Sequence, residues 1–259
     1  MKRLFLSPLL RLLARNRSGV AMLEFGLSLP IVMGLGAYGL EMSNLALLNL
    51  RVSQIALNLA DNASRVGTYS SLATQQLREV DMNDVLQAAR YQGAGINLTT
   101  NGRITLSSLE NVQQSYDSTT TQRIHWQRCI GVMAGTGYDS SYGVAATSPS
   151  ATYLTTATYD PTAGVDTDTS STDNSASHPG SLAATGMGDS GMLVNAPASS
   201  GVMFVEINYL TKPLFGAWLT SPARIHYVAS YIVRDKRDFA EIYNPTPTAT
   251  RLTCNLHTA

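Results

Sequence analysis

The amino-acid sequence predicts an α+β fold in which one long helix packs on a small antiparallel sheet of about four strands. Three observations lead to this prediction. An apolar run at residues 20–40 is followed without a break by apolar residues spaced three or four apart. Several later stretches alternate apolar and polar residues, as half-buried strands do. Between those stretches, a Ser/Thr-rich segment at residues 138–200 lacks a sustained apolar period.

The apolar run is long enough to cross a bilayer, because a membrane core takes about 20 residues of helix. Residues 20–40 carry one charge, Glu24, and no Lys or Arg occurs between Arg17 and Arg51. A carboxylate in such a span costs about 2.5 kcal/mol or more on insertion scales. Glu24 is therefore a candidate functional residue.

The helical pattern continues beyond the span on one amphipathic face. Its apolar residues are Met42, Leu45, Leu48, Val52, Ile55 and Leu59. This spacing predicts one helix over residues 20–66, with its upper half in lipid and its lower half packed on a domain. Gly67 is expected to end the helix, because glycine is common just beyond a helix C-terminus.

The charges are unevenly distributed, although the chain as a whole is neutral. Residues 1–19 hold five of the 18 basic residues and no acid, so the remainder has 13 basic and 18 acidic residues, a net charge of −5. Short basic flanks stay in the cytoplasm, which predicts a cytoplasmic N-terminus and an exported C-terminal part. The part expected to fold has no basic stripe, so nucleic acid is excluded as a partner.

The chain has two cysteines, Cys129 and Cys254. An even number of cysteines in an exported domain predicts a disulfide, with two free thiols as the alternative. Their wide separation excludes a CxxC redox or zinc site.

The remaining elements follow from local patterns. A second helix is expected over residues 81–90, started by a capping-box-like pair, Asp81 and Asp84, and stopped by Gly93. Asn101-Gly102 predicts a tight turn before the first strand. The strand-like stretches are residues 103–106, 122–127, 202–209 and 224–233. In the last of them the alternation predicts one buried and one solvated face.

Residues 138–200 contain 22 Ser or Thr, six Asp and no Lys or Arg. Such a composition buries too little apolar surface to offset the entropy of ordering, so a loosely ordered insertion is expected. The predicted organisation is a basic leader at 1–19, the long helix at 20–66, a domain built from 67–137 and 201–259, and the insertion at 138–200.

Several short motifs suggest chemistry but have simpler interpretations. Gly34, Gly36 and Gly39 spell GxGxxG without the preceding strand that a dinucleotide site requires. Gly188-Asp-Ser-Gly191 matches the surroundings of a serine-protease nucleophile, which would make Ser190 catalytic, but the flanking residues do not match and a turn is favoured.

No metal site is predicted. His125 and His226 fall on strand faces expected to be solvated or hydrogen-bonded, and no HxH or HxxxH spacing occurs. The Asp166-Thr-Asp-Thr-Ser170 stretch resembles the start of a calcium loop but lacks its glycine and glutamate. The charged residues 234–238 are interpreted as a solvated corner rather than a binding patch.

The residues from Gly19 to Phe25 resemble the processing site of a type IV-like prepilin. A basic leader ends in Gly19, and Glu24 and Phe25 are the fifth and sixth residues after it. The wider pattern is similar to the TadE-like minor pilins, or pseudopilins, of the tight-adherence (Flp) pilus system. The similar stretches are Gly19-Val-Ala-Met-Leu-Glu-Phe with Leu29-Pro30, Trp126-Gln-Arg-Cys129, Val202-Met-Phe-Val-Glu206, Val233-Arg-Asp-Lys-Arg-Asp238, Ile242-Tyr-Asn244 and Cys254.

The resemblance implies a pilin-like fold and a role in pilus assembly for surface adhesion, with no catalysis and no cofactor. A prepilin peptidase would cut after Gly19 and leave Val20 first. Glu24 would then meet the α-amine of a neighbouring pilin. The implied partners are the peptidase, major and minor pilins, an inner-membrane assembly platform and lipid. The chain would cross the inner membrane once, with its C-terminal domain in the periplasm or in an extracellular pilus.

Two other functions stay open at this stage. One is an unprocessed single-pass periplasmic scaffold or binding protein, and the other is a tethered hydrolase that uses Ser190. The pilin hypothesis is the leading one, and the hydrolase is the more remote of the two alternatives.

Overall fold

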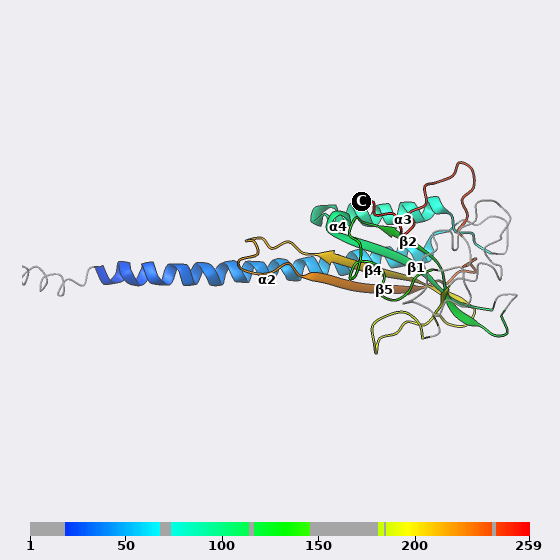
Figure 1. Ribbon diagram of the computed structural model, residues 1–259, viewed down its shortest axis with the longest axis horizontal. Helices are drawn as coiled ribbons and strands as arrows, with labels where there is room; N and C mark the ends of the chain where they lie inside the picture. Colours follow the sequence, from blue (N-terminus) through cyan, green and yellow to red (C-terminus); the bar gives the residue numbers. More distant parts are fainter. Residues whose placement is uncertain (1–18, 68–73, 114–116, 146–180, 184, 240–241) are drawn as a thin grey trace, which may run out of the picture. The chain divides into compact units, whose positions relative to one another are not determined.

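The computed structural model describes residues 19–67, 74–113, 117–145, 181–183, 185–239 and 242–259 (Figure 1). The expected leader up to residue 18 and the calcium-loop-like stretch at 166–170 lie outside the described residues. The chain divides into two compact units. One comprises Met1–Ala46 with Lys212–Ser221, and the other comprises Leu47–Thr211 with Pro222–Ala259.

The predicted long helix is confirmed as α2, Val20–Arg65, with Pro30 inside it. Its second half belongs to the larger unit and contributes to that unit's core. The buried residues there are Val52, Ile55, Ala56, Leu59, Ala60 and Ala63. Gly67 follows the helix with φ 154°, and a Cβ at this position would lie 2.6 Å from the Gln75 side chain. A side chain at residue 67 would therefore be both strained and blocked.

The second helix, α3 (Glu79–Gly93), begins two residues earlier than the sequence predicts. Asp81 is its third residue, and its carboxylate accepts hydrogen bonds from the backbone N–H and the guanidinium of Arg78, at 3.3 and 3.0 Å. The predicted capping pair of Asp81 and Asp84 is therefore wrong. Asp81 does cap the start of the helix, but its partner is Arg78, the residue just before α3.

The tight turn predicted at Asn101-Gly102 does not form. A short 3-10 helix η2 (Ala94–Ile96) and α4 (Leu98–Asn101) lead into the first strand instead. The chain turns at Asn97, which takes the left-handed conformation at φ 51°. Gly102 is extended, and a Cβ there would lie 2.5 Å from the Asn208 carbonyl oxygen. This glycine allows close approach of two strands rather than a turn.

The sheet contains the four predicted strands, each apart from the last longer than predicted, and one short additional strand. These are β1 (Gly102–Val112), β2 (Thr121–Ile130), β3 (Ser181–Leu182), β4 (Ser200–Leu210) and β5 (Arg224–Ile232). Their order is β3-β2-β1-β4-β5, and every neighbouring pair is antiparallel. The arrangement is thus an α+β fold in which the long helix packs on an antiparallel sheet, as predicted (Figure 1).

The face of the sheet that points away from α2 was predicted to be solvated. This prediction is wrong, because that face is covered. Both described ends of the Ser/Thr-rich segment pack there, around a cluster that includes strand residues such as Phe204. The cluster residues from these ends are Tyr142, Ala145, Ala183, Met187 and Ala196. The segment is therefore well packed at its described ends. The composition of residues 138–200 did not predict this packing, because apolar side chains are a small part of it. Its centre, residues 146–180, lies outside the described part.

The predicted disulfide joins Cys129 to Cys254, with Cα atoms 4.7 Å apart, so the free-thiol alternative is wrong. The C-terminal segment runs beside the end of β2, where the Cys129 N–H donates to the Leu252 carbonyl oxygen at 2.7 Å. The disulfide therefore ties an otherwise irregular C-terminal segment to the sheet.

Replacing both cysteines by alanine is expected to lower the free energy of unfolding by about 4–5 kcal/mol, because the disulfide closes a very long loop in the unfolded chain. Urea unfolding of the full chain in detergent micelles would measure this change. Reducing agent should destabilise the wild type by a similar amount and leave the double variant unaffected. Equal stability of oxidised and reduced wild type would contradict the expectation.

Candidate functional site

The first half of α2 is the one helix among the described residues that is long and apolar enough to cross a membrane. Its most apolar stretch has a mean hydropathy of 1.7, and the described residues bury none of that stretch. Large apolar side chains face outward all around it, including Met22, Phe25, Leu27, Ile31 and Leu35. A continuous apolar surface of this size requires a cover, either lipid or other protein.

The sequence-predicted processing residues lie together at the start of this helix. Gly19 immediately precedes Val20, the first helical residue. A Cβ at Gly19 would have no heavy atom of the described residues within 4 Å. Phe25 follows in the second turn with 64% of its surface exposed.

Glu24 lies one helical turn after Val20, on the exposed part of α2. Within the described residues, no side chain forms an ion pair or hydrogen bond with its carboxylate. The sequence offers no cation between Arg17 and Arg51 to do so. Any partner for this charge in a membrane must come from the start of the helix or from another molecule.

A second helix carboxylate, Glu41, was not singled out from the sequence. It directly follows the apolar span and is 5% exposed. Its oxygens accept hydrogen bonds from the backbone N–H groups of Leu214, at 2.9 and 3.2 Å, and of Phe215, at 3.3 Å. Both partners belong to the Lys212–Ser221 segment of the same compact unit. No local pattern points to these bonds, because 173 residues separate Glu41 from Leu214.

Charged side chains are also buried within the sheet domain. The Glu79 carboxylate at the start of α3 accepts two bonds from the Arg128 Nε, at 3.0 and 3.1 Å, and also pairs with Nη2 of that guanidinium. His125, expected on a solvated face, is fully buried with its Nδ1 2.7 Å from Glu110 Oε1. The register of β1 and β2 shifts between Ser107 and Leu109, and such a bulge changes the face to which the opposing residues point.

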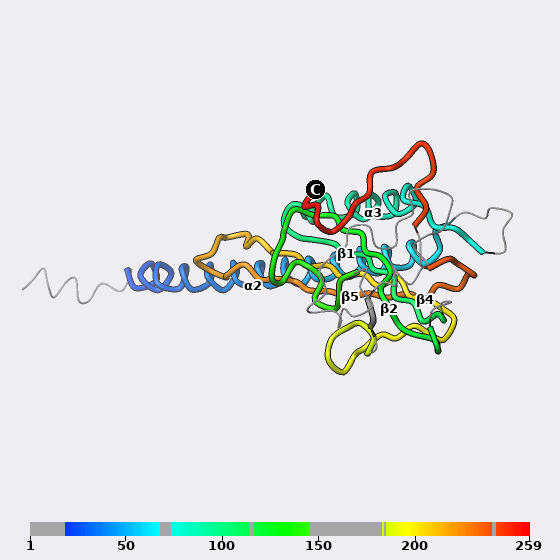
Figure 2. Tube along the Cα trace, turned by 45° about the vertical axis from the view of Figure 1, so that its right-hand side comes forward, coloured from blue at the N-terminus to red at the C-terminus, as the bar shows by residue number. Residues whose placement is uncertain are grey.

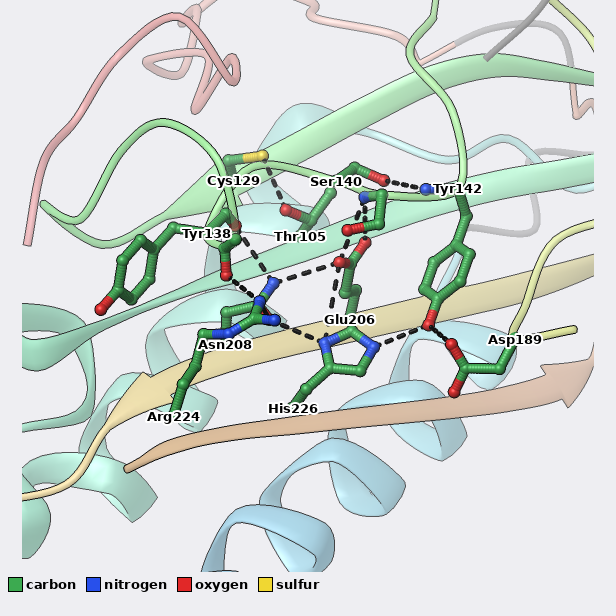
Figure 3. A network of polar contacts seen from close by, with 12 residues as sticks. Thr105, Cys129, Tyr138, Ser140, Tyr142, Asp189, Glu206, Asn208, Arg224 and His226 are labelled. Atoms are coloured by element: carbon green, nitrogen blue, oxygen red, sulfur yellow. Dashed lines mark hydrogen bonds and ion pairs between the residues drawn. The ribbon is translucent and has the colours of Figure 1, made fainter. Parts of the chain in front are cut away.

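On the opposite face, a polar network joins the sheet to both ends of the Ser/Thr-rich segment (Figure 3). His226 lies on β5. Its Nε2 is 2.6 Å from the Tyr142 hydroxyl oxygen, and its Nδ1 is 2.7 Å from Asn208 Oδ1. The Tyr142 hydroxyl in turn donates to Asp189 Oδ1 at 2.5 Å. Tyr142 and Asp189 lie on opposite sides of residues 146–180 in the sequence, so the Tyr142 hydroxyl joins two distant segments, and His226 ties that hydroxyl to the sheet.

Glu206 supports this network from the middle of β4. Its carboxylate accepts from the Ser141 N–H at 3.2 Å and from the Asn208 amide at 3.1 Å. Burial raises the pKa of Glu206, and these hydrogen bonds oppose the shift. Burial lowers the pKa of His226, with the Asp189 charge opposing this effect and the Arg224 charge adding to it. The contribution of this network to the stability of the fold is therefore expected to change with pH.

The Gly188-Asp-Ser-Gly191 motif forms a tight hairpin turn. Met187 and Val194 exchange two backbone hydrogen bonds across it, at 2.7 and 3.0 Å, and the Met192 N–H bonds to the Asp189 carbonyl oxygen at 2.9 Å. The Asp189 side chain is engaged with Tyr142. This geometry is that of the turn favoured from the sequence.

Comparison with known proteins adds no family to this description. No protein-family model matches the chain, and neither a curated protein nor a solved structure matches it. Within the part of the chain that the structure describes, no group of three His, Cys, Asp or Glu side chains is placed to hold a metal ion. The residues themselves must carry any functional argument.

The lowered pKa of His226 predicts a loss of stability on acidification. The unfolded chain takes up a proton near the ordinary histidine value of 6.5, whereas the folded chain does so only at lower pH. The free energy of unfolding should therefore fall as the pH drops below about 6.5, until the folded-state pKa has also been passed. Urea unfolding at pH 7.5 and 5.5 would measure this fall.

The H226Q variant should show a smaller fall than the wild type, because glutamine does not titrate. Replacing the exposed His257 by glutamine provides the matched control and should leave the fall unchanged. The raised pKa of Glu206 acts in the opposite sense, since acidification favours its protonated folded form. An identical pH dependence in H226Q and the wild type would contradict the prediction.

Proposed function

We propose that the chain is a membrane-anchored minor pilin or pseudopilin that takes part in assembling a tight-adherence (Flp) pilus. The observation that carries the proposal is the single helix α2, Val20–Arg65. It begins directly after Gly19, exposes an apolar span with one acid, Glu24, and ends in the core of a sheet domain. A protein that serves first as a membrane anchor and then as an assembly subunit needs these features in this order.

The proposed processing is hydrolysis of the Gly19–Val20 amide bond by a prepilin peptidase. Water adds to the Gly19 carbonyl carbon, the leader leaves with a new carboxylate, and Val20 becomes a free α-amine. No heavy atom of the described residues would obstruct a Cβ at Gly19, which supports access by such an enzyme. Cleavage would also remove the five basic residues that hold the N-terminus in the cytoplasm.

The new amine gives Glu24 a partner of opposite charge. A lone carboxylate in lipid is costly, and so is a lone ammonium group, whereas a pair offsets much of both penalties. We propose that Glu24 pairs with the N-terminal α-amine of an adjacent pilin, which would fix the register between neighbouring helices. Phe25 and the other outward apolar side chains would supply the packing between them.

The proposed location is the inner membrane, with the sheet domain in the periplasm. The partners would be the prepilin peptidase, major and minor pilins, and an inner-membrane assembly platform. In this role the chain would act by assembly rather than catalysis, and the buried networks of the domain would keep it rigid after export.

Co-expression with the cognate prepilin peptidase is expected to shorten the protein by the 19 residues of the leader, with Val20 first. N-terminal sequencing and intact mass would identify the product. The G19V variant should remain uncut because the added side chain obstructs the scissile bond. G26A, a matched glycine change inside the span, should be cut normally. An uncut wild type would reject the pilin proposal and favour an unprocessed periplasmic scaffold.

The E24Q variant should still enter the membrane but lose its assembly with other pilins. We expect the affinity for the major pilin, read from co-purification, to fall about a hundredfold or more, because removing one partner of a buried ion pair costs about 3–5 kcal/mol. The matched control is S28A, since the Ser28 hydroxyl already donates to the Phe25 carbonyl oxygen, at 3.2 Å. Unchanged co-purification of E24Q would refute the register role of Glu24.

A further inference from the structure

The Lys212–Ser221 segment connects β4 to β5 and forms one compact unit with the first part of α2. The Glu41 carboxylate holds it there through the backbone N–H groups of Leu214 and Phe215. Glu41 directly follows Leu40, the last residue of the apolar span. The hydrogen bonds therefore set the segment at the end of the span, and Figure 1 shows it running beside α2.

The segment exposes a concentrated apolar surface. Leu214 is 61% exposed, Phe215 39% and Trp218 75%. The chain has two tryptophans, and the other, Trp126, is fully buried in the sheet domain. A turn closed by a bond from the Leu219 N–H to the Gly216 carbonyl oxygen, at 3.3 Å, orders the tip of the segment. An ordered tip with an exposed tryptophan indicates a surface made for contact.

The charge of the segment indicates what it contacts. Lys212 is its only charged residue. The nearby Glu41 carboxylate is almost completely covered, so it presents little negative charge at the surface. A tryptophan, further apolar side chains and one cation at the end of an apolar helix match the interface between lipid headgroups and acyl chains.

We propose that Lys212–Ser221 is a second membrane contact, in which Trp218, Phe215 and Leu214 enter the interface of the bilayer that α2 crosses. This inference rests on the membrane span of the proposed function. A single span leaves the tilt of α2 in the bilayer unrestricted. A second contact beside Glu41 restricts that tilt and so sets the direction in which the helix leaves the bilayer.

The test uses the fluorescence of the full chain reconstituted in vesicles that contain anionic and zwitterionic lipids. Bromine atoms placed near the glycerol end of the acyl chains should quench Trp218 strongly, and bromine atoms near the chain ends should quench it less. Acrylamide in the water should quench it weakly. The W218F variant leaves only the buried Trp126 and should lose the lipid-dependent quenching while retaining an apolar side chain.

Carbonate extraction of the same vesicles separates this inference from the proposal on which it rests. Protein that resists extraction but shows no quenching of Trp218 by brominated lipid would overturn the second contact and leave the span intact. Protein that carbonate removes would overturn both. Shielding of Trp218 from acrylamide without quenching by bromine would assign the surface to a second copy of the chain and would also overturn the lipid contact.

The role of Glu41 is tested by E41Q in the same vesicles. This change removes the charge that strengthens the bonds to Leu214 and Phe215, and should lower the ratio of docked to released segment about tenfold. Ser43 gives the matched control, because its hydroxyl bonds within the helix to the Gly39 carbonyl oxygen at 2.8 Å. S43A should retain wild-type quenching, and wild-type quenching in E41Q would show that Glu41 does not position the segment.

Discussion

The apolar side chains of α2 must be removed from water along the whole length of the helix, and the rest of the structure depends on how this is done. In the second half the chain itself supplies the cover, because Val52, Ile55 and Leu59 are buried in the core of the sheet domain. Along the most apolar stretch of the first half, the described residues supply none. The same secondary structure therefore requires two different surroundings, one provided by folding and one by a membrane or by neighbouring helices.

Two carboxylates of α2 lie in or directly after the apolar span, and they meet the cost of a charge beside apolar surface in different ways. Glu41 is covered and satisfied by backbone N–H groups, so it can sit beside apolar surface without a cation. Glu24 has no such partner among the described residues, although the surroundings there are at least as apolar. Glu41 is thus satisfied by folding, whereas under the proposed function Glu24 would be satisfied by assembly.

Buried polar groups give the sheet domain its specificity. On one side, Glu79 and Arg128 join the start of α3 to β2. On the other, His226 and Glu206 hold the first end of the Ser/Thr-rich segment, and Tyr142 of that end bonds to Asp189 of the second end. Each group would be costly if it lost its partner, so the elements can associate in few alternative ways.

The parts of this structure that depend on local patterns could be predicted from the sequence. The 3.6-residue periodicity of α2, the alternation in the strands and the even cysteine count all gave correct elements. Buried charges could not be predicted, because Arg128 and His125 in a strand look like residues of a solvated face, and their partners Glu79 and Glu110 lie on other elements of the chain. The bonds of Glu41 were missed for a related reason, since their partners are backbone groups far away in sequence.

The central claim is that α2 is one uninterrupted helix that passes from a membrane into the core of a folded domain. Hydrogen exchange of the full chain in lipid nanodiscs, resolved by peptide, tests it most directly. The account predicts slow exchange from about residue 24, after the first unbonded turn, through Arg65, with no gap at residues 36–46. Fast exchange across residues 36–46 would mean that the anchor and the domain are separate helices and would contradict the account.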